Sequence, residues 1–195
     1  MKNSKLRKVL LLACSAVLLV CLSVGATLAY LTSTDTVKNT FTVGKVAITL
    51  DEVIVDEYGV ATTTNLRGDA NTYKLLPGHK YTKDPTIHVA AGSEDCWLFV
   101  KIENGISGIE ADKTIAAQMG EKGWTLVADT TNVYSYKDIQ SAGADVVVFD
   151  NFTIKGDADV ANYDGKTIAI TAYAIQADGF ESMNAADIWA EIPKA

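Results

Sequence analysis

The chain is 195 residues long and carries 17 basic and 24 acidic side chains, which gives a formal net charge of −7. An acidic surface of this kind repels phosphate backbones and anionic lipid headgroups, so we expect no nucleic-acid partner.

The first 29 residues have the layout of a secretory signal peptide. Four basic side chains occur before position 9, an uncharged apolar stretch follows from 9 to 24, and small residues precede Ala29. We therefore expect cleavage between Ala29 and Tyr30 and secretion to the cell surface or the extracellular matrix. Removal of the four basic residues leaves 13 basic against 24 acidic side chains, a net charge of −11. Residues 30–195 are enough for one domain with its own core.

Two other interpretations of the N-terminal segment exist. A retained transmembrane anchor is one, since the apolar stretch approaches the roughly 20 residues that span a bilayer. A lipoprotein is the other, because Cys14 and Cys21 follow apolar residues, although the apolar run before Cys14 is short and Val20 is bulky for the position before a lipidated cysteine. Cleavage at Ala29 fits the small residues best. It leaves Cys96 as the single cysteine, which excludes an internal disulfide and predicts a buried thiol.

Alternating apolar and polar residues, rich in Thr, Val and Ile, predict β-strands over the first half of the mature chain. Pro77-Gly78 predicts a turn, because proline presets φ and glycine takes the positive φ of a type II turn. Pro85 bars a helix at Asp84. Gly44-Lys45 predicts a bend, and the polar stretch 59–71 predicts a loop or a weak hairpin. The expected strands are 39–43, 46–50, a continuing ribbon over 51–58, 86–90 and 96–103.

The strand at 96–103 is the most apolar of these. Leu98, Val100 and Ile102 share one face, whereas Trp97 and Phe99 share the other. Apolar residues on both faces are typical of an interior strand, so we expect this strand to be covered on both sides at one end.

Two short helices are expected in the second half of the chain. One covers 110–118 with Asp112 as its cap, and the other covers 182–191 with Ser182 as its cap. Ile188, Trp189 and Ile192 are the residues expected to dock the second helix. Further strands are expected at 124–127, 133–136, 144–149, 152–154 and 166–175. The predicted fold is all-β, a single jelly-roll-like β-sandwich over 30–195 with two short helices, preceded by the signal peptide.

The residues that bear chemistry give no firm site. A catalytic zinc needs three protein ligands and a general base, and the chain has only two histidines as zinc candidates, His79 in a turn and His88 in a strand. We expect both to face solvent. Calcium candidates are Asp157, Asp159 and Asp164 in the acidic loop 156–165, which lacks the central Gly and the final Glu of an EF-hand. We therefore expect no enzyme activity, no catalytic residue and no cofactor, with weak Ca²⁺ binding as the alternative.

One stretch resembles the start of a known family. Leu28-Ala29-Tyr30-Leu31-Thr32-Ser33-Thr34-Asp35-Thr36-Val37, followed by Asn39-Thr40-Phe41-Thr42-Val43-Gly44, is similar to the signal-plus-first-strand signature of the TasA/camelysin family. Its members are exported β-sandwich proteins of Gram-positive bacteria, and the better-known ones are biofilm-matrix fibre subunits. Pro77-Gly78, Lys83-Asp84-Pro85, Ser93-Glu94-Asp95-Cys96 and Tyr173-Ala174-Ile175-Gln176 also resemble family positions.

The resemblance implies a secreted fibre subunit that is cut by a dedicated signal peptidase. It also implies assembly by strand exchange, in which the N-terminal segment of one subunit inserts into the next, so the partners are other copies or related matrix subunits. The apolar anchors of that segment would be Tyr30, Leu31, Val37, Phe41 and Val43. These residues could instead pair within their own domain. The rival functions are a secreted camelysin-like metallopeptidase and a non-polymerising ligand-binding surface module, which a deep aromatic-lined groove would favour.

Overall fold

The computed structural model describes residues 45–61, 66–111 and 113–193. All of them belong to the second of two compact units, Val43–Ala195. The expected cleavage site at Ala29 and Tyr30, and the predicted assembly residues Leu31, Val37, Phe41 and Val43, lie outside the described residues. In the part of the chain that is described, no helix has the length and apolar character needed to cross a membrane.

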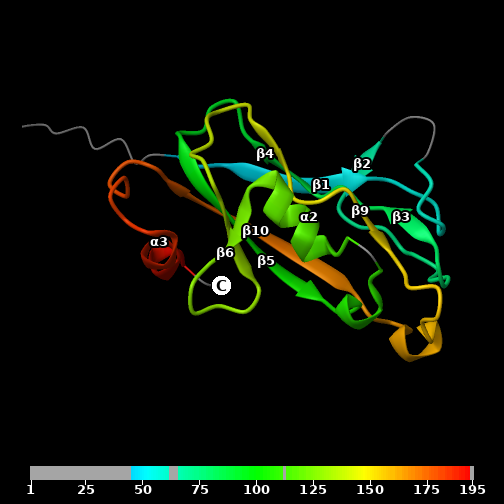
Figure 1. Ribbon diagram of the computed structural model, residues 1–195. Coiled ribbons are helices and arrows are strands. Elements are labelled where there is room, and N and C mark those ends of the chain that lie inside the picture. The colour runs from blue at the N-terminus through cyan, green and yellow to red at the C-terminus, as the bar shows by residue number, and fades with distance from the viewer. Residues whose placement is uncertain (1–44, 62–65, 112, 194–195) are drawn as a thin grey trace, which may run out of the picture. The chain divides into compact units, whose positions relative to one another are not determined.

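The fold is mostly β, and every strand pair is antiparallel (Figure 1). The first sheet has the order β2-β1-β4-β8, with bounds Arg67–Gly68, Ile48–Val53, Thr86–Val89 and Asp145–Val147. The second has the order β10-β5-β7-β6, with bounds Ile168–Gln176, Cys96–Asn104, Val133–Tyr136 and Trp124–Leu126. A small third sheet pairs β3, Lys80–Thr82, with β9, Asn151–Thr153. These sheets are compatible with the predicted all-β sandwich.

Strand β5 separates two hydrophobic clusters, as its sequence predicts. Leu98, Val100 and Ile102 are buried in the main core, together with Ile87 and Val89 of β4 in the first sheet. On the opposite face of β5, Phe99 packs in a smaller cluster that includes residues of the C-terminal helix. The expectation that one end of this strand is covered on both sides is therefore confirmed.

Cys96 opens β5 and is fully buried in the main core. Burial raises the pKa of its thiol to about 11, with a smaller contribution from the Asp95 carboxylate. A thiol with a raised pKa carries little thiolate at neutral pH, so this cysteine acts as a small apolar side chain. The prediction of a buried thiol is confirmed.

Helix α2, Ile115–Lys122, begins later than expected. Its cap is Thr114, whose hydroxyl accepts a hydrogen bond from the Ala117 N–H at 3.2 Å. Asp112, the expected cap, lies outside the described residues. The start of the stretch 110–118 is not helical, because Glu110 forms a β-bridge with Ile154, which holds this part of the chain in an extended conformation.

Helix α3, Ala185–Glu191, is capped by Asn184 and not by Ser182. The Asn184 side-chain oxygen accepts from the N–H groups of Ala186 and Asp187, each at 3.0 Å. Ser182 does not cap the helix, because it lies within a turn in which the Met183 N–H donates to the Phe180 carbonyl, and the helix begins only after this turn. The docking prediction is confirmed, since Ile188 and Ile192 are buried in the smaller cluster and Trp189 packs against it.

Several boundaries in the first half differ from the prediction. Strand β1 ends at Val53, and the expected ribbon over 51–58 continues only as a bridge between Val55 and Ala61. The stretch 59–71 contains β2, which pairs with β1, so the hairpin alternative holds there. Strand β3, which directly follows the Pro77-Gly78 turn, was not predicted. The turn at Gly78 has the expected positive φ of 73°.

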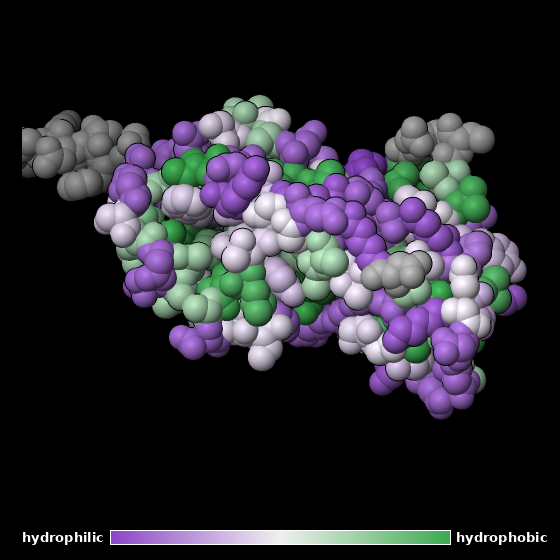
Figure 2. Space-filling model, in the orientation of Figure 1, coloured by the Kyte–Doolittle hydropathy of each residue, from purple (hydrophilic) through white to green (hydrophobic). Residues whose placement is uncertain are grey.

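The face of the protein that carries α2 mixes hydrophilic side chains with smaller hydrophobic areas (Figure 2). The large exposed apolar side chains among the described residues are Tyr58, Val60, Leu66, Leu76, Leu126 and Ile139. Four of these six lie between positions 58 and 76, so exposed apolar surface gathers around the β1–β2 connection and the segment after it.

Candidate functional site

The structure places the two zinc candidates in separate environments. His79 follows the Pro77-Gly78 turn, and its Nε2 lies 2.9 Å from the carbonyl oxygen of Tyr58. His88 lies on β4 between two carboxylates. Both rings are partly exposed and hydrogen-bonded, so they face solvent only in part.

The calcium candidates Asp157, Asp159 and Asp164 are all exposed around the short 3₁₀ helix Val160–Tyr163. Asp159 accepts a hydrogen bond from Asn162 at 2.8 Å. Over the described ranges, no group of three or more His, Cys, Asp or Glu side chains is arranged to hold a metal ion. The structure therefore does not bring either candidate set together into such a group.

A charged network joins all four strands of the first sheet on its outer face. His88 contacts Asp145 of β8 through Nδ1 at 2.6 Å and Asp51 of β1 through Nε2 at 2.9 Å. Arg67 of β2 donates to Asp51, to Asp84 at 2.9 Å and to the Thr86 hydroxyl at 2.8 Å. Both ring nitrogens of His88 face carboxylates, so the charged imidazolium is the form that can donate to both.

The pKa of His88 is raised, first by its hydrogen bond to Asp51 and then by its hydrogen bond to Asp145. Burial raises the pKa of Asp51, but the bonds from Arg67 and His88 outweigh it, and the net shift is downward. A raised histidine pKa means that the folded state holds the proton more tightly than the unfolded state does. The network is therefore most stabilising when His88 is protonated.

This shift predicts a pH dependence of stability. The contribution of His88 is fully present below the unfolded pKa of about 6.5 and is lost as the pH rises through the higher folded pKa. We expect His88→Gln to destabilise the protein at pH 6 and to matter progressively less toward about pH 8. Denaturant unfolding across this range measures the effect, and His79→Gln serves as the matched control. An equal effect of His88→Gln at both ends of the range would contradict the assignment.

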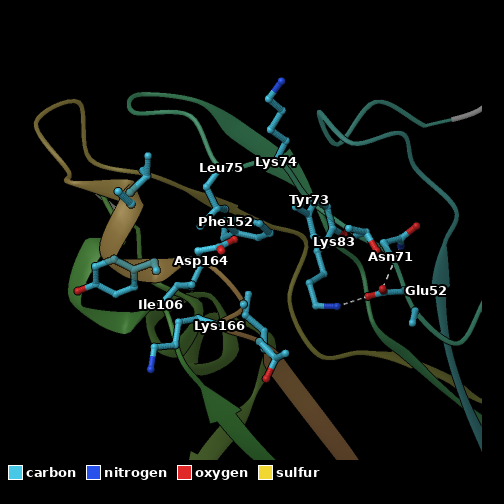
Figure 3. Close-up of a pocket in the computed structure, with 18 of the residues that line it drawn as sticks. Glu52, Asn71, Tyr73, Lys74, Leu75, Lys83, Ile106, Phe152, Asp164 and Lys166 are labelled. Atoms are coloured by element: carbon cyan, nitrogen blue, oxygen red, sulfur yellow. Dashed lines mark hydrogen bonds and ion pairs between the residues drawn. The ribbon is translucent and has the colours of Figure 1, made fainter.

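A groove of about 930 Å³ opens between the segment 69–75 and the segment 160–168. The side chains that define it are Glu52, Asn71, Tyr73, Lys83, Phe152 and Tyr163 (Figure 3). They come from β1, β9, the 3₁₀ helix Val160–Tyr163 and the segments on either side of β3. We call this site the Glu52–Lys83 groove. The sequence did not predict it.

An ion pair between Lys83 and Glu52 forms one wall of the groove (Figure 3). The two side chains are only 9% and 5% exposed. Asn71 donates to Glu52 at 2.9 Å and to the Val53 carbonyl at 2.8 Å, and its own oxygen accepts from the Val55 N–H at 2.9 Å. Both N–H groups of the amide are therefore used, and one of them orients the carboxylate toward Lys83.

Aromatic rings line the groove beside this ion pair, and Lys83 Nζ lies 6.0 Å from the centroid of the Tyr73 ring. Tyr73 meets Phe152 edge to face at 5.2 Å between ring centroids, and Phe152 stacks on Tyr81 at 4.9 Å. The Tyr73 hydroxyl donates to the Thr82 carbonyl at 3.0 Å, and burial is the main reason that its pKa is raised. Tyr163 is half-buried at the mouth of the groove. A groove with a partly aromatic lining favours the ligand-binding alternative, although that alternative called for a deep, aromatic-lined groove.

One sequence signal could have pointed to this groove. Val46, Ile48 and Leu50 face the main core in a period of two, and the next residue in that phase is Glu52. A carboxylate in an apolar phase is rarely buried without a partner. The partner Lys83 lies 31 positions away, so only the tertiary structure identifies it.

The outer edges of β1 and β10 form a second candidate site, which we call the β1/β10 edge. Strand β10 pairs with β5 alone among the described strands, and β2 covers only Glu52 and Val53 of β1. Apolar residues of both strands that pack against the main core are only half-buried along this edge: Val46, Ile48, Leu50, Ile168, Ile170, Ala172 and Ala174. The β5 residues paired with Ile170, Ala172 and Ala174 are buried, namely Ile102, Val100 and Leu98.

Backbone groups are also open along β10. Thr167 accepts from Gly105 through its carbonyl, and Ala177 donates to Asp95 through its N–H, at 2.9 and 2.8 Å. Because backbone direction alternates along a strand, the odd-numbered residues of β10 point toward β5. The even-numbered residues therefore direct their N–H and C=O groups to the outer edge, where no described strand pairs with them.

Comparisons with known proteins give no relative for this chain: no family model, curated protein or solved structure matches it.

Proposed function

We propose that this protein is a secreted structural subunit with a jelly-roll-like β-sandwich fold, which forms fibres in a biofilm matrix or on the cell surface. In this proposal a signal peptidase cuts between Ala29 and Tyr30, and residues 30–43 of one copy insert as a strand at the β1/β10 edge of the next. The observation that carries the proposal is that edge, with its open backbone groups and half-buried apolar side chains.

An extended segment satisfies both features of the edge at once. Its backbone would pair with the unpaired N–H and C=O groups, and its apolar side chains would cover the half-buried residues. Residues 30–43 reach about 46 Å at about 3.3 Å per residue, which exceeds the roughly 30 Å length of the nine-residue β10. Because the donor and acceptor surfaces differ, repetition of the contact produces an open filament. Pairing of the same segment within its own domain is the competing arrangement, and it gives a monomer.

Removal of the donor segment tests the proposal. We expect a chain that lacks residues 30–38 to form no filaments, because the strand that bridges two copies is shortened from the end that enters the neighbour. The described domain should stay folded, which circular dichroism measures, while electron microscopy of the purified mature protein scores the filaments. If the truncated protein forms filaments as readily as the wild type does, the strand-exchange proposal is contradicted.

Two substitutions on β10 provide a matched pair at the acceptor surface. Ala172 is half-buried and faces the main core at the β1/β10 edge, whereas Ala169 is exposed on the same strand. Ala172→Asp should block assembly, because an inserted strand would have to bury the new carboxylate. Ala169→Asp adds the same charge without that cost and should leave filaments intact.

A further inference from the structure

We propose that the Glu52–Lys83 groove is a binding site for a neutral carbohydrate. This inference does not rest on fibre assembly, although Ile168 belongs both to the groove lining and to the β1/β10 edge.

The ion pair in the groove offers both kinds of hydrogen-bonding group. Lys83 has three N–H donors, and its ammonium makes one hydrogen bond among the described residues, to Glu52. Its side chain is 9% exposed and lines the groove, and its Nζ lies 6.0 Å from the centroid of the Tyr73 ring, which also lines the groove. Buried charged groups need their hydrogen-bonding capacity filled, by the protein or by what enters the site.

The carboxylate beside it has acceptor capacity to spare. Each Glu52 oxygen takes one hydrogen bond, from Asn71 or from Lys83, and a carboxylate oxygen accepts up to two. A wall with donors and acceptors side by side fits two adjacent hydroxyl groups, one donating to Glu52 and the other accepting from Lys83. Adjacent hydroxyls that both donate and accept are characteristic of sugars.

The charge of the groove favours a neutral ligand. Its lining holds three acidic and three basic side chains, Glu52, Asp69, Asp164, Lys74, Lys83 and Lys166, so its formal charges cancel. Because these charges cancel, the groove exerts no net long-range electrostatic attraction on an anion or on a cation. A purely apolar ligand fits poorly as well, because it would leave the Lys83 donors without partners.

The remaining walls suit the apolar faces of sugar rings. Tyr73, Phe152 and Tyr163 provide aromatic surface, and Leu75, Ile106 and Val160 add aliphatic surface. The C–H groups of a pyranose ring pack on such surfaces, while its hydroxyls point outward to polar groups. A volume of about 930 Å³ lies within the range of small-ligand sites and accommodates more than one ring.

Titration calorimetry with four neutral tetrasaccharides, cellotetraose, N-acetylated chitotetraose, mannotetraose and galactotetraose, tests the proposal. We expect at least one of them to bind at micromolar to millimolar concentration. Tyr163→Ala should weaken that binding roughly tenfold or more, because it removes an aromatic wall and leaves the ion pair intact. Tyr58→Ala is the matched control, since Tyr58 is exposed and lies outside the groove.

A second variant separates recognition from folding. Glu52→Gln with Lys83→Met removes both charges together and keeps an acceptor for Asn71, so we expect it to fold and to lose at least roughly tenfold in affinity. Tetragalacturonate and a neutral tetrapeptide serve as competing probes. The proposal is overturned if none of the four neutral tetrasaccharides binds, if only a competing probe binds, or if both groove variants bind as the wild type does.

Discussion

Lys83→Met alone should lower the free energy of unfolding by about 3–5 kcal/mol, because it leaves the buried Glu52 carboxylate without a cation. The double variant Glu52→Gln with Lys83→Met should lower the free energy of unfolding far less. Replacing both members of a buried ion pair removes the uncompensated charge together with the attraction, and such replacements are often neutral or stabilising. The difference between the single and the double variant is therefore the informative quantity.

Denaturant unfolding of the two variants and the wild type gives this difference. Lys122→Met is the matched control, because Lys122 pairs with Asp150 at 2.8 Å with side chains that are 28% and 56% exposed. An exposed pair contributes about 0–1 kcal/mol, so we expect a small change there. If Lys83→Met destabilises the protein no more than Lys122→Met does, water reaches the buried pair and the account of the groove wall is wrong.

Alternation is clearest in the long strands, although the short strands β6, β7 and β9 were also predicted at or near their positions. Strand β5 has nine residues, and alternation over that length was enough to predict which residues enter each cluster. Strand β10 is equally long and pairs with β5 in register from Ile168 to Gln176, so the second half of the chain was also anticipated. Strands β2 and β3 were missed, because β2 lies in the polar stretch 59–71 and β3 directly follows the Pro77-Gly78 turn, where turn residues dominate the pattern.

Helix starts were predicted less well, since several cap-forming residues stand close together in the sequence. Asp112 and Thr114 are both acceptable caps, as are Ser182 and Asn184. The choice is made by contacts that the local sequence does not contain. For α2 it is the bridge between Glu110 and Ile154, two residues 44 positions apart, that delays the helix.

The candidate sites depend even more on tertiary structure. His88 was singled out from the sequence, but its partner Asp145 is 57 positions away and is brought to it by the register of β4 and β8. Glu52 and Lys83 meet in the same way across 31 positions. Sequence patterns give the face on which a residue lies, whereas strand register decides which charges meet. That is why the histidines were expected to face solvent and were found hydrogen-bonded.

Gly59→Ala should lower the free energy of unfolding by about 3 kcal/mol, from backbone strain and overpacking together. Gly59 has a φ of 75°, which a residue with a Cβ adopts only with strain. A Cβ at this position would also lie 2.8 Å from the Tyr81 Cα and 3.0 Å from the Thr82 backbone nitrogen. Tyr81 cannot move aside easily, because it is fully buried and stacks on Phe152.

Gly143→Ala separates the two contributions to this cost. Gly143 has a similar φ of 80°, but no atom lies within 4 Å of the Cβ that would be added. It therefore reports backbone strain alone, at about 1–2 kcal/mol. Comparison of the two variants by denaturant unfolding gives the cost of pushing on β3. Equal effects of the two variants on the free energy of unfolding would mean that β3 moves to accommodate the added methyl group. The contact between the β1–β2 connection and Tyr81 would then add nothing to the rigidity of the aromatic cluster beside the groove.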